Sequence, residues 1–324
     1  MSTRAPLRVL DETTPPGPLA EAACVLVVGN FDGVHRGHQS VLREAVGSAR
    51  AHGLRPCVLT FDPHPAAVVG GGASPMLTTV ARRAELMSDV GVEQVYVRRF
   101  DTAFAAWPPE RFARELVAEA LRSRVVVVGQ NFRFGAKRAG DLALLRRLGA
   151  ELGFEVRVHA IAADERGPFS STRAREAIAA GELEEATHVL GRPHELSGVV
   201  VHGDERGRTI NFPTANLEPV PEMLPPDGVY AVQVDELDDE DGARPLAGGV
   251  TNIGMRPTVG GTRRTIETFL LGFAGDLYGL RLRLHLVARL REERKFASLD
   301  ELKLQITRDC AAAREKLALR QEVF

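Results

Sequence analysis

The sequence predicts an α/β domain followed by an all-β domain: a doubly wound parallel sheet, then a small antiparallel β-barrel with a C-terminal helix. The chain has 324 residues, more than one ordinary hydrophobic core accommodates. In the first half, short apolar runs alternate with helix-like segments, which is typical of a parallel sheet covered on both faces. After "GRPHELSG", alternating strand-like runs follow one another between Gly and Pro, which is typical of a barrel. We place the boundary near Gly191, with domains at 1–190 and 191–324.

The first half is built from apolar strands and the helices between them. "RVVVV" at 124–128 is the clearest central strand, and the helix at 109–121 starts with a proline. Two helices, at about 172–180 and 182–190, close this half. The other expected strands are 25–28, 57–61, 94–97 and 155–159, and the other expected helices are 37–52, 79–90 and 140–152.

The second half contains strands with period-two alternation and one last helix. The helix begins at Ser298, which forms a capping box with Glu301. The acidic run "DELDDEDG" at 235–242 is expected to be a solvated hairpin loop. The expected strands are 198–202, 228–235, 248–253, 265–271 and 280–290.

Composition excludes several classes of function. The formal net charge is −2, so general attraction to nucleic acid or to an anionic membrane is not expected. The three cysteines match neither a metal site nor a disulfide framework, which favours a reducing, cytoplasmic location. The sequence does not reveal an oligomeric state, and a homo-oligomer stays open.

The stretch "VVGNFDGVHRGH" indicates a first phosphate site. A buried strand runs into a Gly-containing turn, and His35 and His38 follow at the start of a helix. Free N–H groups and the helix dipole favour an anion there. The imidazoles can donate to phosphate oxygens and neutralise developing charge, and Gly37 would let a ligand approach the backbone closely. The alternative is that two histidines cap a surface helix.

A second phosphate site is indicated by "FSSTRAREAI". Ser171 and Thr172 stand at a helix start, and Arg173 and Arg175 lie in its first turn. Cations at a helix N-terminus oppose the macrodipole, a conflict that an anion between them would resolve. From these residues alone, an N-cap with two solvated arginines is the preferred interpretation.

The second half carries a candidate metal site and a candidate base. In "FPTANL", Thr214 and Asn216 point the same way if the segment is extended, and their oxygens suit Mg²⁺ bridged to phosphates. In "RTIETFLLGF", alternation places Glu267 with Phe269 and Leu271. A carboxylate among apolar side chains is costly for stability but suits a general base acting on an alcohol. The alternatives are a simple turn after a strand, and an edge strand that faces water.

These motifs together resemble a known family. "GNFDGVHRGH", "TFDPHP", "VVVGQNFRFG" and "SSTRAR", in this order, resemble the adenylyltransferase module of bacterial bifunctional riboflavin kinase/FAD synthetases. "GVVVHGDERGRTINFPTANL", "GVTNIGMRPTVGG", "IETFLLGF" and "REERKF" resemble the riboflavin kinase module. The resemblance runs from about Cys24 to the last helix.

The resemblance implies two ATP-dependent reactions. The second half would phosphorylate riboflavin to FMN, and the first, a nucleotidyltransferase domain, would transfer AMP from ATP to FMN, giving FAD and pyrophosphate. Riboflavin, FMN and ATP are the implied partners, with Mg²⁺ bound to ATP as co-substrate.

The resemblance also implies roles for individual residues. In the kinase half, Glu267 would be the catalytic base, Thr214 and Asn216 the Mg²⁺–ATP ligands, and the segment from Gly203 to Arg208 the phosphate loop. In the first half, the ATP-phosphate residues would be Gly29, Phe31, His35, Gly37, His38, Ser171, Thr172 and Arg175, and the flavin residues Pro63, His64, Pro65 and Asn131.

Three positions depart from the family pattern. Asn211 stands where the family usually has Gly, Ala174 replaces a larger apolar residue, and Phe269 stands where His or another polar residue is common. They leave open a paralogue with altered substrate preference. Two other functions stay open. One is a nucleotidyltransferase that acts on another phosphorylated alcohol, but the β half would have no role in that reaction. The other is a regulator that binds flavin or nucleotide, but such a protein would not need to keep Glu267.

Overall fold

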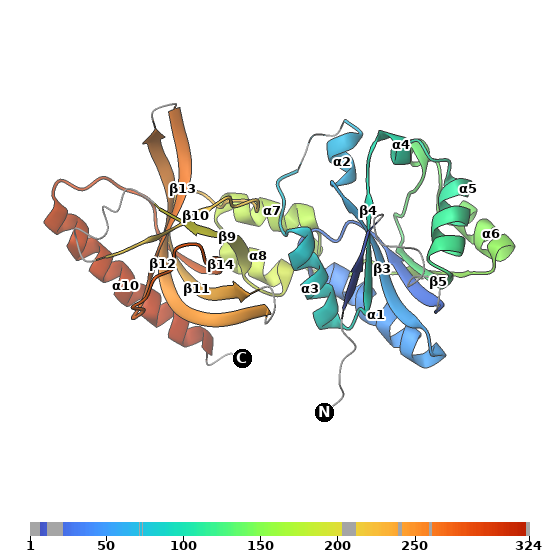
Figure 1. The fold of residues 1–324 in the computed structure, drawn as a ribbon, viewed down its shortest axis with the longest axis horizontal. Helices are drawn as coiled ribbons and strands as arrows, with labels where there is room; N and C mark the ends of the chain where they lie inside the picture. The colour runs from blue at the N-terminus through green and yellow to red at the C-terminus, as the bar shows by residue number, and fades with distance from the viewer. Residues whose placement is uncertain are drawn as a thin grey trace. The chain divides into compact units, whose positions relative to one another are not determined.

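The structure is a computed structural model that describes residues 7–11, 22–70, 72, 74–202, 212–238, 242–258 and 261–321. The chain forms two compact units, Met1–Ser171 and Thr172–Phe324 (Figure 1). No helix among the residues described is long and apolar enough to cross a membrane.

The first unit is built on a parallel sheet whose strand order is β1-β4-β3-β2-β5-β6. All of its strand pairs are parallel, so the predicted sheet type is confirmed. β1 was not predicted, because a strand of three residues is too short to show the alternation of polar and apolar residues that is typical of strands. The strands are β1 (Arg8–Leu10), β2 (Cys24–Val28), β3 (Arg55–Asp62), β4 (Gln94–Arg99), β5 (Ser123–Gly129) and β6 (Glu155–His159).

Helices cover both faces of this sheet, as a doubly wound fold requires (Figure 1). In β2, Val25 and Val27 pack with α1 (Arg36–His52) and α3 (Val80–Val90). The alternate residues of β2 pack on the other face, with η1 (Phe112–Ala120) and α6 (Leu142–Leu152). The short elements between these are α2 (Pro65–Val68), α4 (Thr102–Ala105), α5 (Pro109–Arg111), η2 (Ala136–Arg138), β7 (Ala163–Asp164) and β8 (Gly167–Pro168).

The predicted helix at 109–121 is present, but most of it has the hydrogen bonds of a π-helix instead of those of an α-helix. It starts as α5 and continues as η1, a π-helical segment. At its end the N–H of Leu121 donates to the carbonyl of Leu116, five residues back, at 3.0 Å. The wider turn still directs Phe112 and Leu116 to the sheet, so apolar spacing alone did not distinguish it from an α-helix.

The second unit begins with two helices, α7 (Ser171–Ala180) and α8 (Leu183–Leu190). Leu183 belongs to the apolar cluster that fills the barrel. Packing therefore groups these helices with the barrel, whereas the predicted boundary near Gly191 groups them with the first half. That boundary, which was inferred from the change in residue pattern after "GRPHELSG", stays a prediction.

The barrel is closed and antiparallel, as predicted, with strand order β10-β13-β12-β11-β14-β9. In β13, Ile266, Thr268 and Leu270 alternate with Glu267 and Phe269, so the first three face the barrel interior and the other two face outward. The outer face of β11 packs against α10 (Leu299–Gln321), where Cys310 and Ala313 meet Val229. The strands are β9 (His194–Val201), β10 (Ala215–Glu218), β11 (Gly228–Asp238), β12 (Gly242–Thr258), β13 (Gly261–Leu270) and β14 (Arg281–Arg291).

The prediction that the acidic run at 235–242 is entirely a loop is wrong for its first part. β11 continues through Asp238, and Asp235 pairs with Arg283 of β14. The Asp235 carboxylate accepts a hydrogen bond from His285 Nε2 at 2.7 Å. Partners on neighbouring strands therefore extend the strand into residues of low β-propensity.

Helix α10 is fixed to the barrel by a paired charge. Arg291 at the end of β14 donates through Nε and NH2 to the Asp309 carboxylate, at 2.8–3.1 Å. Asp309→Ala would leave the half-buried guanidinium unpaired, so we expect the free energy of unfolding to fall by about 2 kcal/mol. Thermal or urea unfolding measures this loss, and Glu315→Ala, which removes an exposed acid of the same helix, is the matched control. Equal stability of the two variants would contradict the anchoring role.

Candidate active sites

The first site begins at the turn between β2 and α1. Phe31, Gly33 and Val34 adopt positive φ angles of 53°, 83° and 38°. Positive φ is rare for bulky residues, so surrounding contacts must hold this turn. The principal contact is the carboxylate of Asp32, which is 4% exposed and accepts from the N–H groups of Leu77 and Thr78 at 3.0–3.1 Å.

Asp32 was not predicted as a site residue. Its carbonyl also accepts from the hydroxyl of Ser171 at 2.8 Å, which fixes the start of α7 beside the turn. The local sequence "NFDG" indicates a turn, but the partners of Asp32 lie far along the chain. The predicted phosphate-binding Ser171 is therefore joined to the turn that precedes the two histidines.

His35 and His38 are brought together by the start of α1. His35 is the N-cap, and its Nδ1 accepts from the N–H of His38 at 3.3 Å. The two rings stack, with centroids 3.6 Å apart. An accepting nitrogen carries no proton, so the proton of the neutral His35 ring is on Nε2. Helix capping is thus one role of His35, and it leaves Nε2–H as a donor.

Burial governs the protonation of His38. Its pKa is held well below the usual value by desolvation, and the nearby His35 and Arg83 add to this. Nδ1 of His38 is buried and has no hydrogen-bond partner among the described residues. Near neutral pH the ring is therefore uncharged and acts through hydrogen bonding rather than as a cation.

Packing within the protein leaves little room for a side chain at Gly29 or Gly37, two of the three glycines of this segment. A Cβ on Gly37 would lie 2.8 Å from the carbonyl oxygen of Phe169, and one on Gly29 would lie 3.1 Å from the Phe31 ring. The group that approaches Gly37 closely is thus a backbone carbonyl, where the sequence suggested a ligand. Phosphate binding at these glycines stays a prediction.

The other predicted residues of this half lie where neighbouring strands end. β2, β3 and β5 are adjacent and parallel, so the loops that follow them meet at one edge of the sheet. Pro63, His64 and Pro65 follow β3, and the exposed Asn131 follows β5. β2 is the strand from which the connections run in both directions, the place where doubly wound sheets bind ligands.

His64 is joined to the first turn by a side-chain hydrogen bond. Its Nδ1 accepts from the N–H of Ala66 at 3.2 Å, and its Nε2 lies 3.0 Å from the side-chain amide of Asn30. The contact joins Nε2 of His64 to Nδ2 of Asn30. Asn30, which was not predicted, thus fixes the predicted flavin loop beside the turn.

Helix α7 carries Thr172, Arg173 and Arg175 in its first turns. Arg173 does not need an anionic ligand to balance it, because its guanidinium pairs with Glu185 of α8 at 2.7–2.8 Å. The conflict between cations and helix dipole is therefore partly resolved within the protein. Thr172 is exposed and Arg175 is half-buried one turn further along.

The second site is a cavity of about 540 Å³ between the outer face of the barrel and α10. Thr214, Glu267 and Phe269 line it together, so the predicted alternation along β13 is confirmed for Glu267 and Phe269. Phe269 packs edge-on against Phe212, with ring centroids 5.2 Å apart. The remaining described lining residues are Val229, Val250, Asn252, Arg291, Glu293, Arg294, Phe296, Leu299, Leu302, Ile306 and Asp309.

Strand register sets three polar residues in a row on the outer face of the barrel, and two of them, Glu267 and Asn252, line the cavity. Glu267 lies directly across from Asn216 on β10 and from Asn252 on β12. Directly opposed residues share a face of the sheet, so the three side chains point to the same side. Asn252 was not predicted, because its place beside Glu267 depends on the pairing of two strands.

The oxygens of Thr214 and Asn216 suit Mg²⁺. Magnesium that arrives with nucleotide phosphates needs only one or two protein oxygens, and a hydroxyl and an amide oxygen are both hard donors. Among the residues described, no group of three or more His, Cys, Asp or Glu side chains forms a metal site. The donor set thus fits a metal that phosphates and water largely coordinate.

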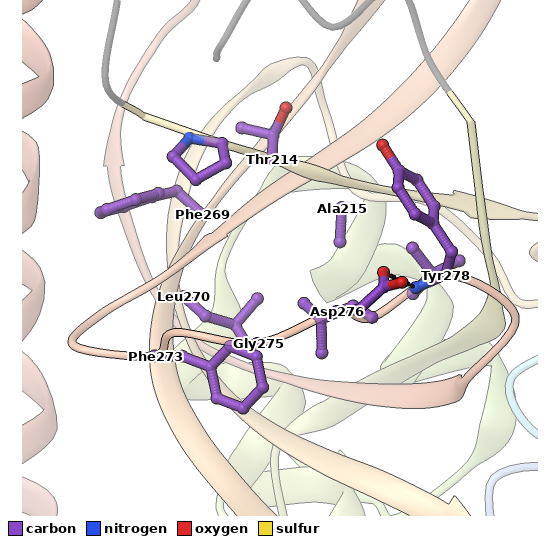
Figure 2. A pocket seen from close by; sticks show the side chains of 11 residues that line it. Thr214, Ala215, Phe269, Leu270, Phe273, Gly275, Asp276 and Tyr278 are labelled. Carbon is purple, nitrogen blue, oxygen red and sulfur yellow. Dashed lines mark hydrogen bonds between the residues drawn. The ribbon is translucent and has the colours of Figure 1, made fainter.

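Thr214 also lines a second, smaller cavity of about 80 Å³ (Figure 2). Thr214 and Phe269 line both cavities. Tyr278 and Asp276 form another wall, where the N–H of Tyr278 donates to the Asp276 carboxylate at 3.0 Å. Thr214 is therefore placed where ligands in the two cavities would meet. Gly203, Arg208 and Asn211 lie outside the described residues.

The fold and these sites define the class of protein: a parallel-sheet unit of nucleotide-binding topology joined to a barrel whose cavity holds a carboxylate. The chain matches the family model for FAD synthetase over residues 18–173 and that for riboflavin kinase over residues 190–317. A bifunctional riboflavin kinase/FMN adenylyltransferase of Escherichia coli (strain K12) is 43% identical over 300 residues, which cover 92% of this chain and 94% of the relative. A Bacillus subtilis protein of the same name is 35% identical, covering 89% and 91%.

A crystal structure from Streptococcus pneumoniae has the same fold. That protein, described as a macrolide-efflux protein, is 30% identical, with a TM-score of 0.82 and coverage of 95% of this chain and 99% of the other. This chain belongs to the family of bifunctional riboflavin kinase/FMN adenylyltransferases.

The low pKa of His38 predicts a pH dependence of stability. As the pH falls below about 6.5, the unfolded chain takes up a proton at this histidine before the folded protein does. The stability that depends on neutral His38 is therefore complete above about pH 6.5 and declines below it. His38→Asn should flatten the decline by up to about 1.4 kcal/mol per pH unit. Urea unfolding between pH 5 and 7 measures it, and identical slopes for wild type and variant would contradict the assignment.

Proposed function

We propose that this protein phosphorylates riboflavin to FMN and then adenylylates FMN to FAD, using ATP in both steps. The observation that carries the proposal is the 43% identity to a bifunctional relative over both units. It is supported by the cavity in which Glu267 lies beside Thr214. We assign adenylylation to residues 1–190 and phosphorylation to residues 191–324, which accords with the matched ranges 18–173 and 190–317.

In the kinase reaction, the larger cavity would hold the flavin, and the smaller one would take only a part of the nucleotide. Glu267 takes the proton of the 5′-hydroxyl as that oxygen bonds to the γ-phosphorus of ATP and the bond to ADP breaks. Thr214 and Asn216 would hold Mg²⁺, which supplies charge neutralisation at the phosphates. The apolar side chains of the barrel and α10 exclude water from the flavin ring.

In the adenylyl transfer, the FMN phosphate attacks the α-phosphorus and pyrophosphate leaves. This nucleophile is already ionised near neutral pH, so the protein has to position the substrates and stabilise charge. The backbone at the N-terminus of α1 and the imidazole N–H groups of His35 and His38 would donate to ATP phosphates. Ser171, Thr172 and Arg175 would bind the β- and γ-phosphates, and the loop of Pro63, His64 and Pro65, with Asn131, would contact the flavin.

The direct test is incubation with riboflavin, ATP and Mg²⁺, followed by separation of FMN and FAD. Both products should form, with FMN first. FAD formation from added FMN without any conversion of riboflavin would favour a nucleotidyltransferase with an inactive barrel. Binding of flavin without any product would favour a regulatory protein. We also propose a cytoplasmic location, because its three cysteines are free and buried.

Glu267→Gln should separate the two activities. The amide keeps the shape of the side chain but cannot accept the proton, so FMN formation should fall by roughly 10²–10⁴-fold while riboflavin still binds. FAD formation from added FMN should be unchanged, since that reaction has an ionised nucleophile. Glu292→Gln, at an exposed position, is the matched control. A near-normal kinase rate for Glu267→Gln would remove this residue from the mechanism.

Arg175→Ala and His38→Ala should act on the other reaction. Loss of one group that stabilises phosphate charge should lower FAD formation by roughly 10²-fold, with FMN formation close to wild type. His52→Ala, at an exposed position near the end of α1, controls for loss of a histidine from this helix. Equal damage to both activities would show that the residue has a structural role instead.

A further inference from the structure

The carboxylate of Glu267 is held through one of its two oxygens. Oε1 lies 3.1 Å from the guanidinium of Arg256, and the hydroxyl of Thr265 approaches the same atom at 3.5 Å. Within the part of the chain that the structure describes, Oε2 has no hydrogen bond. One oxygen is therefore fixed, and the other is available to accept a proton.

Arg256 reaches Glu267 along the outer face of β12. Glu267 is in register with Asn252, and Arg256 lies four residues further along the strand. Four residues of strand span roughly 13 Å, so the two side chains must extend toward each other to make the pair. Gly254 lies between them on the same face, and a Cβ there would collide with the Glu293 carboxylate. The absence of a side chain at Gly254 thus leaves room for the carboxylate of Glu293.

The pair is only partly exposed and lies beside the cavity. The Arg256 and Glu267 side chains are 27% and 22% exposed, so solvent screens their attraction less than on an open surface. Among the two, only Glu267 lines the cavity. Arg256 therefore contacts the carboxylate from outside the space that a substrate would fill.

We propose that Arg256 is a positioning residue of the kinase reaction. It fixes Oε1 of Glu267 so that Oε2 is presented to the substrate hydroxyl, and Thr265 adds a weaker contact to the same oxygen. The guanidinium acts on the carboxylate from outside the cavity, while the substrate itself is bound by other residues. This inference rests on the proposed kinase function.

The test measures kcat and KM for FMN formation in full-length variants. Arg256→Gln removes the charge and should lower kcat by about 10²-fold, the scale of misplacing a catalytic group, with the KM for riboflavin little changed. Arg256→Lys keeps the cation on a different geometry and should lower kcat by about tenfold. Arg263→Gln is the matched control, because Arg263 is the register partner of Arg256 but is 57% exposed and pairs with Glu218.

A double-mutant cycle shows whether Arg256 acts through Glu267. In a Glu267→Gln background, Arg256→Gln should cause no further loss of kcat, because the oxygen it positions no longer accepts a proton. A full additional loss in that background would overturn the proposal, as would a change in KM alone.

The remaining outcomes are also decisive. If Arg256→Gln no longer binds riboflavin in a fluorescence titration, kcat is compared between Arg256→Lys and the wild type instead. Equal kcat values for these two proteins would overturn the proposal. If the wild type forms no FMN, the proposed kinase function fails and this role fails with it. Normal FMN formation by the wild type and by Arg256→Gln overturns the role of Arg256 alone.

Discussion

Backbone pairing between strands decides where the polar side chains of both sites lie. In the first unit, the parallel register of β2 with β3 and β5 brings the loops that follow them to one edge of the sheet. In the barrel, antiparallel register places Asn216, Glu267 and Asn252 in one row. In both units, side chains far apart in sequence become neighbours because hydrogen-bonded strands leave few choices of alignment.

The spacing of apolar residues correctly predicted the features that depend only on residues close together in the sequence. The apolar run at 124–128 became β5, and the alternation around Glu267 correctly placed it on the same face as Phe269. The order of the motifs indicated the family, which the comparisons confirm. The strand and the alternation could be predicted because each is encoded in one short segment, and the family because its motifs follow one another along nearly the whole chain.

Contacts between distant segments could not be predicted in this way. Asp32 fixes the first turn through backbone groups of Leu77 and Thr78, and nothing in "NFDG" specifies those partners. Arg173 has a charge partner in Glu185, on the next helix. Asp235 belongs to a strand in which it pairs with Arg283 and accepts a hydrogen bond from the His285 side chain. In each case the energy comes from a neighbour that only the folded chain supplies, so local propensity points to a different outcome.

The two sites differ in electrostatics as their proposed reactions require. An alcohol must lose a proton before it attacks phosphorus, so the kinase site needs a carboxylate with a free oxygen, and the pairing of Glu267 Oε1 with Arg256 leaves Oε2 for that task. A phosphate nucleophile is already ionised, so the adenylyltransferase site needs donors rather than a base. There, the carboxylate of Asp32 is occupied by backbone N–H groups, and burial keeps His38 neutral. The two units thus use a carboxylate in opposite ways. The barrel leaves the carboxylate of Glu267 available to react, whereas the sheet unit uses that of Asp32 to hold the turn before the stacked rings of His35 and His38.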